Sequence, residues 1–174
     1  MTSRLTPAEL AARIPAGMVS VAARPDGSLV EWLPIMLFDL GRKSLVLDLA
    51  GRWAWAVDPV GKNQLHGFQE PEAIGALPIL ERDPGSLGET MTPAASSIGI
   101  SVEQLILSLP DRPLVQCAFR TRSDYWIERA LEWAERWDRP ERPSAALEAL
   151  VDESQVRQDL RHRARRLIVP GFSS

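Results

Sequence analysis

The sequence has one cysteine and no long apolar run, and these two shortages exclude several classes of protein. Cys117 has no second cysteine to pair with, which excludes an intramolecular disulfide and a zinc site built from several thiolates. The longest apolar stretch, residues 33–40, is interrupted by Pro34 and Asp39 and is far shorter than the roughly 20 residues of a membrane span. The N-terminal segment carries Glu9 and has no apolar core followed by a small-residue cleavage site, so it does not resemble a signal peptide. We therefore expect a reduced, cytoplasmic protein.

Lysine is also scarce. Lys43 and Lys62 are the lysines among the 20 basic residues, so arginine supplies nearly all the positive charge. This bias, together with abundant Ala, Leu and Pro, is typical of a GC-rich bacterial genome. The 23 acidic residues give a formal net charge of −3, so the chain as a whole has no general attraction to nucleic acid or to anionic lipid.

Hydrophobic residues make up 45% of the 174 residues and charged residues 25%, which are ordinary values for a globular protein. The pattern predicts a single α+β domain over residues 1–174, with an N-terminal antiparallel meander sheet packed by C-terminal helices. Residues 1–60 read as mostly strands, 58–95 as rich in loops, and 101–168 as mostly helical.

Turn and capping signals divide the N-terminal part into short elements. Thr6 to Glu9 form a capping box, which predicts a helix to about Arg13. Turn spacing then predicts strands at residues 18–23, 28–33, 35–40, 44–49 and 52–57. Residues 58–95 contain many Pro and Gly, which favours long surface loops with one short strand at 76–80.

The C-terminal part carries further helix signals. Ser101 and Gln104 form a second capping box, and the helix that they open should stop at Pro110. Alternation at residues 114–121 predicts one more strand. Serine caps and proline breaks then predict helices at 124–138, from Ser144, and from Ser154 to about Ile168.

Trp53 and Trp55 are two residues apart, so on a strand they share one face, with Ala54 and Ala56 on the other. The pair is compatible with a ligand platform or an exposed anchor for a partner protein. Two indoles on a half-buried strand are more commonly part of the core.

The helix that begins near Asp124 combines an apolar stripe with a charged face. Trp126, Ala130, Trp133, Ala134 and Trp137 follow helical spacing, widened by Ile127 and Leu131. The other face places acids four residues before arginines, in the pairs Glu132–Arg136, Glu135–Arg139 and Asp138–Arg142. Such a face is typical of a solvated surface, and a docking face for a partner is the alternative.

The last predicted helix carries a line of arginines. Arg157, Arg161 and Arg165 recur at four-residue steps and are able to meet phosphates or an acidic partner. Nearby Asp152 and Asp159 offset this charge, and no aromatic interleaving of a nucleic-acid module accompanies it.

The sequence contains no complete version of the common catalytic motifs. Gly61-Lys62 is followed by Asn63 where a Walker loop requires Ser or Thr, and no HExxH metal motif surrounds His66 or His162. Cys117 lies in an apolar setting typical of a buried, inert thiol. We therefore expect no catalytic residue, no cofactor and no metal.

Two dispersed arrangements remain open for chemistry. Carboxylates at Glu31, Asp39 and Asp48 fall on successive predicted strands and are conceivable as an acid–base or metal site. An enzyme acting on a small molecule or nucleotide is also conceivable, with a site assembled from Asp48, Asp58, His66 and Arg120.

The segments DYWIERALEWAERW and QDLRHRARRL resemble helices of small bacterial immunity proteins from polymorphic toxin systems. The resemblance implies a cytosolic, non-enzymatic protein that binds and blocks a cognate toxin. The composition favours the same class, because an acidic, Trp-rich chain without a catalytic motif is more readily a protein-binding module than an enzyme. The residues predicted to contact a partner are Trp53, Trp55, His66, Glu132, Arg136, Arg161 and Arg165.

Overall fold

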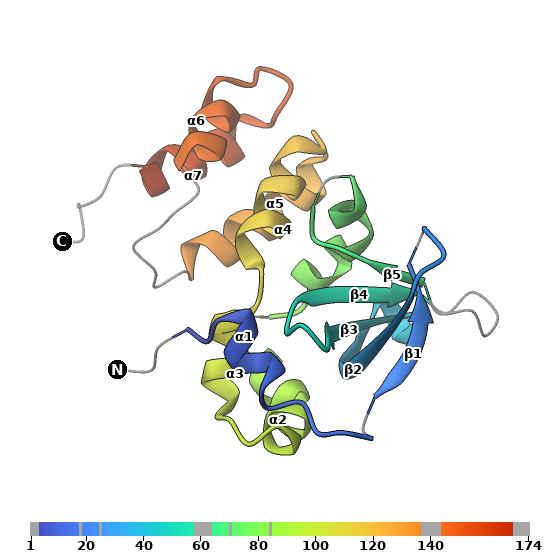
Figure 1. The fold of residues 1–174 in the computed structure, drawn as a ribbon. Helices are drawn as coiled ribbons and strands as arrows, with labels where there is room; N and C mark the ends of the chain where they lie inside the picture. Colours follow the sequence, from blue (N-terminus) through green and yellow to red (C-terminus); the bar gives the residue numbers. More distant parts are fainter. Residues whose placement is uncertain are drawn as a thin grey trace. The chain divides into compact units, whose positions relative to one another are not determined.

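The computed structural model describes residues 4–17, 19–24, 26–57, 64–69, 71–83, 85–136 and 144–168. The chain forms two units: a barrel unit, Met1–Pro110, which contains every described strand, and a helical unit, Asp111–Ser174 (Figure 1). The predicted α+β class is confirmed. Among the described residues, no helix combines the length and the apolar character needed to cross a bilayer.

The barrel unit begins with the short helix α1 (Pro7–Ala11), which starts at the predicted capping box. Thr6 Oγ1 accepts a hydrogen bond from the Glu9 backbone N–H at 3.3 Å, and the Glu9 carboxylate accepts one from the Thr6 N–H at 2.7 Å. These two bonds satisfy donors that a helix N-terminus otherwise leaves unpaired. The helix predicted from this motif is confirmed.

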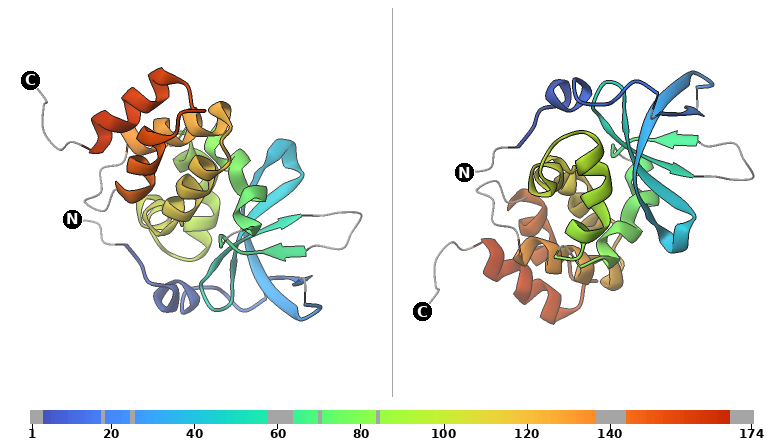
Figure 2. Two further views of the ribbon diagram at one scale, coloured as in Figure 1. Left: turned by 90° about the horizontal axis from the view of Figure 1, so that it is seen from above. Right: turned by 90° about the horizontal axis from the view of Figure 1, so that it is seen from below.

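A meander of five described strands curls into a small closed barrel (Figure 2). The strands are β1 (Ser20–Ala23), β2 (Leu29–Phe38), β3 (Lys43–Asp48), β4 (Trp53–Val57) and β5 (Gln64–His66). Successive strands are antiparallel, and β1 closes the barrel by pairing in parallel with β5 at Ala23 and Gln64. The predicted meander is confirmed, while β5 lies in a region predicted to be loop.

The prediction of two separate strands at 28–33 and 35–40 is wrong, because both belong to the single strand β2. The pairing of β2 with β3 shifts between Pro34 and Met36. Proline has no backbone N–H to give to a ladder, and strands accommodate it at such irregularities. Beyond Phe38, the chain turns through the short 3-10 segment η1 (Asp39–Gly41) into β3.

Buried apolar side chains of several sizes share one face of the curled sheet. One cluster contains Trp32, Val46, Ala54, Ala56 and Leu65, all buried. Side chains alternate along a strand, so the large residues between these positions, including Leu45, Leu47 and Trp55, lie on the outer face, where they are also buried. The predicted separation of Trp53 and Trp55 from Ala54 and Ala56 is therefore confirmed.

The prediction of long loops with a strand at 76–80 is wrong for much of 58–95. Residues 64–66 form β5, and the region also contains the 3-10 helix η2 (Glu72–Glu81) and the helix α2 (Leu87–Ser97). Leu77, Ile79 and Leu80 are buried, so η2 belongs to the core. Burial of these apolar residues outweighs the turn preference of the surrounding Pro and Gly. Residues 58–63, 70 and 84 lie outside the described residues.

Helix α2 packs against β2 and against α3 (Val102–Ser108). The predicted capping box that opens α3 is present, because Ser101 Oγ accepts from the Gln104 N–H at 3.2 Å and Gln104 Oε1 accepts from the Ser101 N–H at 3.1 Å.

The helical unit contains α4 (Asp111–Arg120), α5 (Asp124–Glu135), α6 (Ser144–Asp152) and α7 (Gln158–Ile168). Helix α5 packs on α4 and α7, and α6 packs on the same two helices, so the four close on one another. The strand predicted at 114–121 is wrong, because these residues belong mostly to α4. The last helix starts at Gln158 instead of near Ser154.

The apolar stripe predicted for α5 is confirmed over its described part. Ile127, Ala130, Leu131, Trp133 and Ala134 are buried. Trp137, Asp138, Arg139 and Arg142 lie outside the described residues.

Candidate functional site

Strands β4 and β5 bring together two of the residues predicted to contact a partner. Trp55 and His66 are paired in the strand register, and their rings stack with centroids 4.4 Å apart at an interplanar angle of 21°. The Trp55 indole N–H donates to the Gly67 carbonyl at 3.2 Å, and the residue is only 6% exposed. Trp55 is therefore a buried structural residue, and the half-buried His66 ring covers one face of the Trp55 indole.

Trp53 lies two residues along the same strand, opposite Leu47. Its side chain is half-buried, and its indole N–H is buried without a hydrogen-bond partner among the described residues. This position matches the core interpretation of the tryptophan pair. A partner contact by Trp53 stays a prediction.

Lys43 joins the β2–β3 turn to η2. Its ammonium group donates to the Gly75 carbonyl at 2.7 Å, forms an ion pair with Asp39 at 3.1 Å, and lies 5.4 Å from the centre of the Trp55 ring. The fit is close, since a Cβ added to Gly75 would lie 2.2 Å from the Trp55 ring. A second link runs from the Arg82 guanidinium to the Leu37 carbonyl at 3.4 Å. Lys43 thus links the turn to η2, and Arg82, directly after η2, links to β2.

Three aliphatic side chains are exposed around this junction: Leu37 at 59%, Leu40 at 94% and Ile74 at 55%. We call this set the aliphatic corner. Leu37 is the second-last residue of β2, Leu40 lies in the turn, and Ile74 precedes the Gly75 carbonyl that Lys43 binds. The links through Lys43 and Arg82 therefore connect η2, which carries Ile74, to the end of β2 and to the turn that carries Leu40.

The turn holds Leu40 in an unusual backbone conformation. Leu40 has φ 53° and ψ 31°, and Asp39 before it has φ 49°. This left-handed region costs a residue with a Cβ roughly 1–2 kcal/mol. Asp tolerates it better than Leu, because its short polar side chain bonds locally. Sequence reasoning missed this site, because Leu40 reads as the last residue of the strand predicted at 35–40.

Asp48 is buried, and its carboxylate is fully engaged by the β3–β4 turn and a neighbouring arginine. It accepts from the Ala50 N–H at 3.0 Å, from the Arg52 N–H at 2.9 Å and Nε at 2.9 Å, and from the Arg24 guanidinium at 3.1 Å. A carboxylate with this many donors is a structural anchor for the turn.

The structure places Asp48 and His66, two of the residues proposed for a dispersed catalytic site, at different positions along the sheet. His66 is level with Leu45 across two strand pairings, so Asp48 is three residues, roughly 10 Å, further along the sheet. Asp58 lies outside the described residues, and Arg120 belongs to the helical unit.

The carboxylates at Glu31, Asp39 and Asp48 do not form one cluster. Glu31 is exposed on β2 opposite Val21, and Asp39 pairs with Lys43 at the far end of that strand. Within the part of the chain that the structure describes, no group of three or more His, Cys, Asp or Glu side chains is placed to hold a metal ion. Cys117 is buried on α4.

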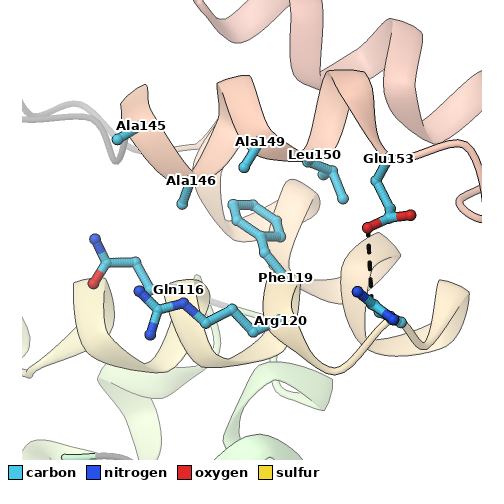
Figure 3. A pocket seen from close by; sticks show the side chains of 9 residues that line it. Gln116, Phe119, Arg120, Ala145, Ala146, Ala149, Leu150 and Glu153 are labelled. Atoms are coloured by element: carbon cyan, nitrogen blue, oxygen red, sulfur yellow. Dashed lines mark ion pairs between the residues drawn. The ribbon is translucent and has the colours of Figure 1, made fainter.

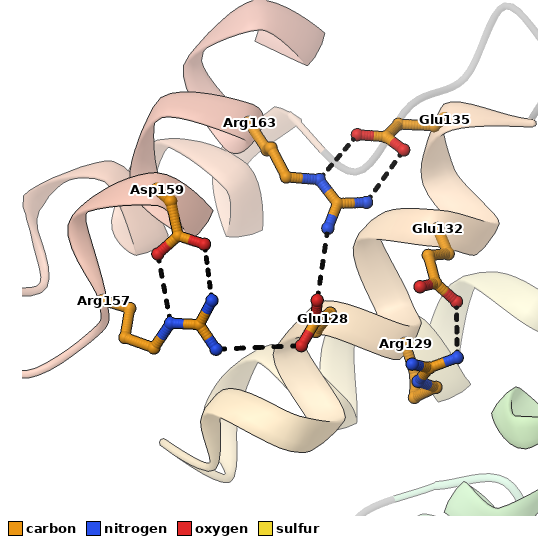
Figure 4. A network of polar contacts seen from close by, with 7 residues as sticks. All are labelled: Glu128, Arg129, Glu132, Glu135, Arg157, Asp159 and Arg163. Atoms are coloured by element: carbon orange, nitrogen blue, oxygen red, sulfur yellow. Dashed lines mark hydrogen bonds and ion pairs between the residues drawn. The ribbon is translucent and has the colours of Figure 1, made fainter.

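In the helical unit, ion pairs connect α5 and α7 (Figure 4). Arg163 donates two hydrogen bonds of 2.9 Å to the Glu135 carboxylate, which raise the pKa of Arg163, and it lies 4.0 Å from Glu128. Arg129 pairs with Glu132 at 2.8 Å. Glu132 and Glu135 thus pair with Arg129 and Arg163, while the predicted partner Arg139 lies outside the described residues.

The arginine line of α7 is partly neutralised. Arg157 bonds Asp159, which raises the pKa of the guanidinium and lowers the pKa of the carboxyl. Arg161 is half-buried, whereas Arg136 and Arg165 are exposed. Binding of a partner by these residues stays a prediction.

The helical unit also contains a pocket of about 350 Å³ between α4 and α6 (Figure 3). The lining residues are Gln116, Phe119, Arg120, Arg122, Ala145, Ala146, Ala149, Leu150 and Glu153. Sequence reasoning did not identify this pocket. It predicted a strand at 114–121, whereas Gln116 and Arg120 lie on the helix α4, which forms one wall of the pocket.

No protein-family model, curated protein or solved structure matches the chain.

Proposed function

We propose that this protein is a non-enzymatic protein-binding module and that the aliphatic corner is its principal contact surface. Within that class, we propose an immunity protein that binds and neutralises a cognate toxin. The second part rests on the resemblance of residues 124–137 and 158–167 to helices of such proteins.

The observation that carries the proposal is the exposure of Leu40 on a left-handed turn. A leucine that is 94% exposed gains almost nothing from burial, and its backbone conformation disfavours folding. Strained residues of this kind occur preferentially at functional sites, where the surrounding structure holds them in place. The Lys43 and Arg82 links supply that rigidity.

The corner has the anatomy of a contact surface. Leu37, Leu40 and Ile74 provide the apolar centre, and the ion pair of Lys43 with Asp39 provides a polar edge whose charges balance. A partner with an apolar patch is able to bury these side chains without leaving a buried charge unpaired. A buried unpaired charge would destabilise the interface.

The other functions considered have less support. A catalytic site from Asp48 and His66 needs groups that lie at different positions along the sheet, with Asp48 already saturated by hydrogen bonds. Nucleic-acid binding through α7 has to compete with the carboxylates that engage Arg157 and Arg163.

Site-specific photo-crosslinking in cells of the source organism tests the proposal. A benzoylphenylalanine residue replaces Leu40, and a matched chain carries it at Ser96, which is exposed on α2. We expect one protein to be captured through position 40 and not through position 96. Equal capture at both positions, or none at position 40, contradicts the corner as a binding surface.

Co-expression then tests the immunity assignment. The captured protein is expressed alone and together with this chain, either native or carrying Leu40→Asp. We expect growth arrest from the captured protein alone, rescue by the native chain and loss of rescue with Leu40→Asp. If the captured protein is harmless in the expressing cell, the immunity assignment is wrong, while the proposal of a protein-binding module still holds.

A further inference from the structure

We propose that the pocket between α4 and α6 binds a small neutral molecule with a flat apolar body and a carboxamide edge, that is, an N–H donor beside a carbonyl acceptor. The pocket lies wholly within the helical unit and does not depend on the aliphatic corner. Its volume of about 350 Å³ is at the small end of the range of small-molecule sites, so the ligand is compact.

The apolar part of the pocket arises from the sequence of two facing helices. Phe119 and Leu150 line the pocket, and both are buried. Phe119 projects from α4 toward α6, which presents Ala146 and Ala149 on its opposite side (Figure 3). Methyl side chains leave space that a Leu or Phe at the same position would fill. A flat ring fits this space by stacking on Phe119.

Gln116 provides a polar group that the protein itself leaves unused. Its side chain extends from α4 toward α6, at the end of the pocket where Ala145 and Ala146 lie (Figure 3). Within the described part of the chain, the Gln116 amide takes part in no hydrogen bond. A side-chain amide carries N–H donors beside a carbonyl acceptor. A ligand carboxamide offers the same groups in the complementary order, so the two amides are able to pair through two parallel hydrogen bonds.

The charged side chains of the lining are already engaged. Arg122 and Glu153 form an ion pair of 3.7 Å at the other end of the pocket (Figure 3). Arg120 has an interaction partner of its own in the structure. A charged ligand would therefore lose hydration without gaining a free counter-charge, whereas a neutral amide loses less hydration and regains hydrogen bonds from Gln116. The lining thus favours a neutral ligand over its acidic or basic analogue.

Titration monitored by amide chemical-shift mapping tests the assignment. The probe is benzamide. Its controls are acetophenone, which has a methyl group in place of the amide NH₂, and benzoate, which has a carboxylate in place of the amide. We expect saturable shifts at Gln116, Phe119, Ala146 and Ala149 with benzamide. Acetophenone should bind about three- to tenfold more weakly, because it keeps the ring and the acceptor and loses the donor. Benzoate should also bind more weakly than benzamide.

A variant of Gln116 tests the amide pairing. Gln116→Leu keeps the approximate size of the side chain and removes its amide. It should lower the affinity for benzamide to that for acetophenone and leave the affinity for acetophenone unchanged, a difference that a merely structural role would not produce. Gln158→Leu, the same change at an exposed position of α7, should leave both affinities unchanged.

A second variant locates the site. Ala149→Phe fills the pocket and should abolish the shifts with both probes, whereas Ala8→Phe, an equivalent change at an exposed position of α1, should leave them intact. Comparison of the three probes on the native chain remains decisive if a variant fails to fold. Equal affinities for benzamide and acetophenone, tighter binding of benzoate, unchanged binding by Ala149→Phe, or no saturable shifts at the lining residues overturns the proposal.

Discussion

Leu40 combines a large apolar side chain, almost complete exposure and a left-handed backbone. Each feature disfavours the folded state of the isolated chain, because the side chain stays in water and the Cβ is crowded by its own backbone. Asp39, Lys43 and the hydrogen bond to Gly75 fix the turn around it. A residue kept in such a position is expected to act in binding and not in folding.

Substitution of Leu40 therefore separates stability from binding. We predict that Leu40→Gly raises the free energy of unfolding by about 1 kcal/mol, because glycine adopts a positive φ without strain and no packing is lost. Urea denaturation measures the change. Leu49→Gly is the control, since Leu49 is an exposed turn residue without a positive φ, and it should lower stability. A Leu40→Gly chain less stable than the native one contradicts this view of the turn.

Gly75 is required by the close approach of η2 to the Trp55 ring. A Cβ at this position would lie 2.2 Å from the ring, which is held by its stack with His66 and its bond to Gly67. We predict that Gly75→Ala destabilises the fold by about 1–3 kcal/mol, the usual range for overpacking. Thermal unfolding gives the value.

Gly88→Ala provides the matched comparison for Gly75→Ala. Gly88 is in α2, and its nearest neighbour to an added Cβ is 4.0 Å away, so the same substitution should be neutral or stabilising by up to about 1 kcal/mol. A similar loss of stability in Gly75→Ala and Gly88→Ala contradicts the close contact between residue 75 and the Trp55 ring.

At the scale of elements, α1 depends on a titratable cap. The Thr6 backbone N–H and then its hydroxyl donate to the Glu9 carboxylate and lower its pKa below the ordinary value of 4.5. Because the folded-state pKa is the lower one, the cap stabilises the helix fully above about pH 4.5. This contribution is lost as the pH falls through the folded-state pKa.

We predict that Thr6→Ala raises the pKa of Glu9 toward 4.5 without reaching it, since alanine keeps the backbone donor. Titration of the Glu9 side chain by nuclear magnetic resonance measures the shift, and Thr92→Ala, which alters a hydroxyl on α2, should leave it unchanged. If the pKa of Glu9 is the same in Thr6→Ala as in the native chain, the Thr6–Glu9 capping box does not form in solution.

Elements were predictable where local chemistry determines them. Both capping boxes identified their helices, and turn spacing identified the meander, because these signals depend on neighbours in the sequence. Helix α4 was missed because apparent alternation at residues 114–121 was weighed above its first turn, which contains Asp111 and Pro113, both common at helix starts. Helix η2 was missed because tertiary burial of Leu77 and Ile79 overrides local preference.

The candidate functional surfaces were harder to predict from the sequence. That Trp55 and His66 stack follows from the register of β4 and β5, and register depends on contacts distant in the sequence. The exposure of Leu40 depends on where β2 ends, which an apolar run does not reveal. The pocket requires two helices to face each other through small residues, and neither helix alone predicts its neighbour.

For the whole molecule, the sequence predicts one domain over residues 1–174. If the whole chain folds as one cooperative domain, it should unfold in one transition. We expect coincident urea midpoints for Tyr and Trp fluorescence, for the amide signals of Ala56 in the barrel and for those of Ala164 in α7. Separate midpoints for Ala56 and Ala164 contradict the prediction and mean that the two units fold independently.

At the scale of the whole molecule, the central proposal is that the aliphatic corner binds a protein partner. Calorimetric titration of the crosslinked partner into the native chain and into Leu40→Gly tests this most directly. We predict at least a tenfold loss of affinity in the variant, about 1.4 kcal/mol, as for a side chain at the centre of an interface, with a fold no less stable than the native one. Equal affinities for the two chains would contradict it.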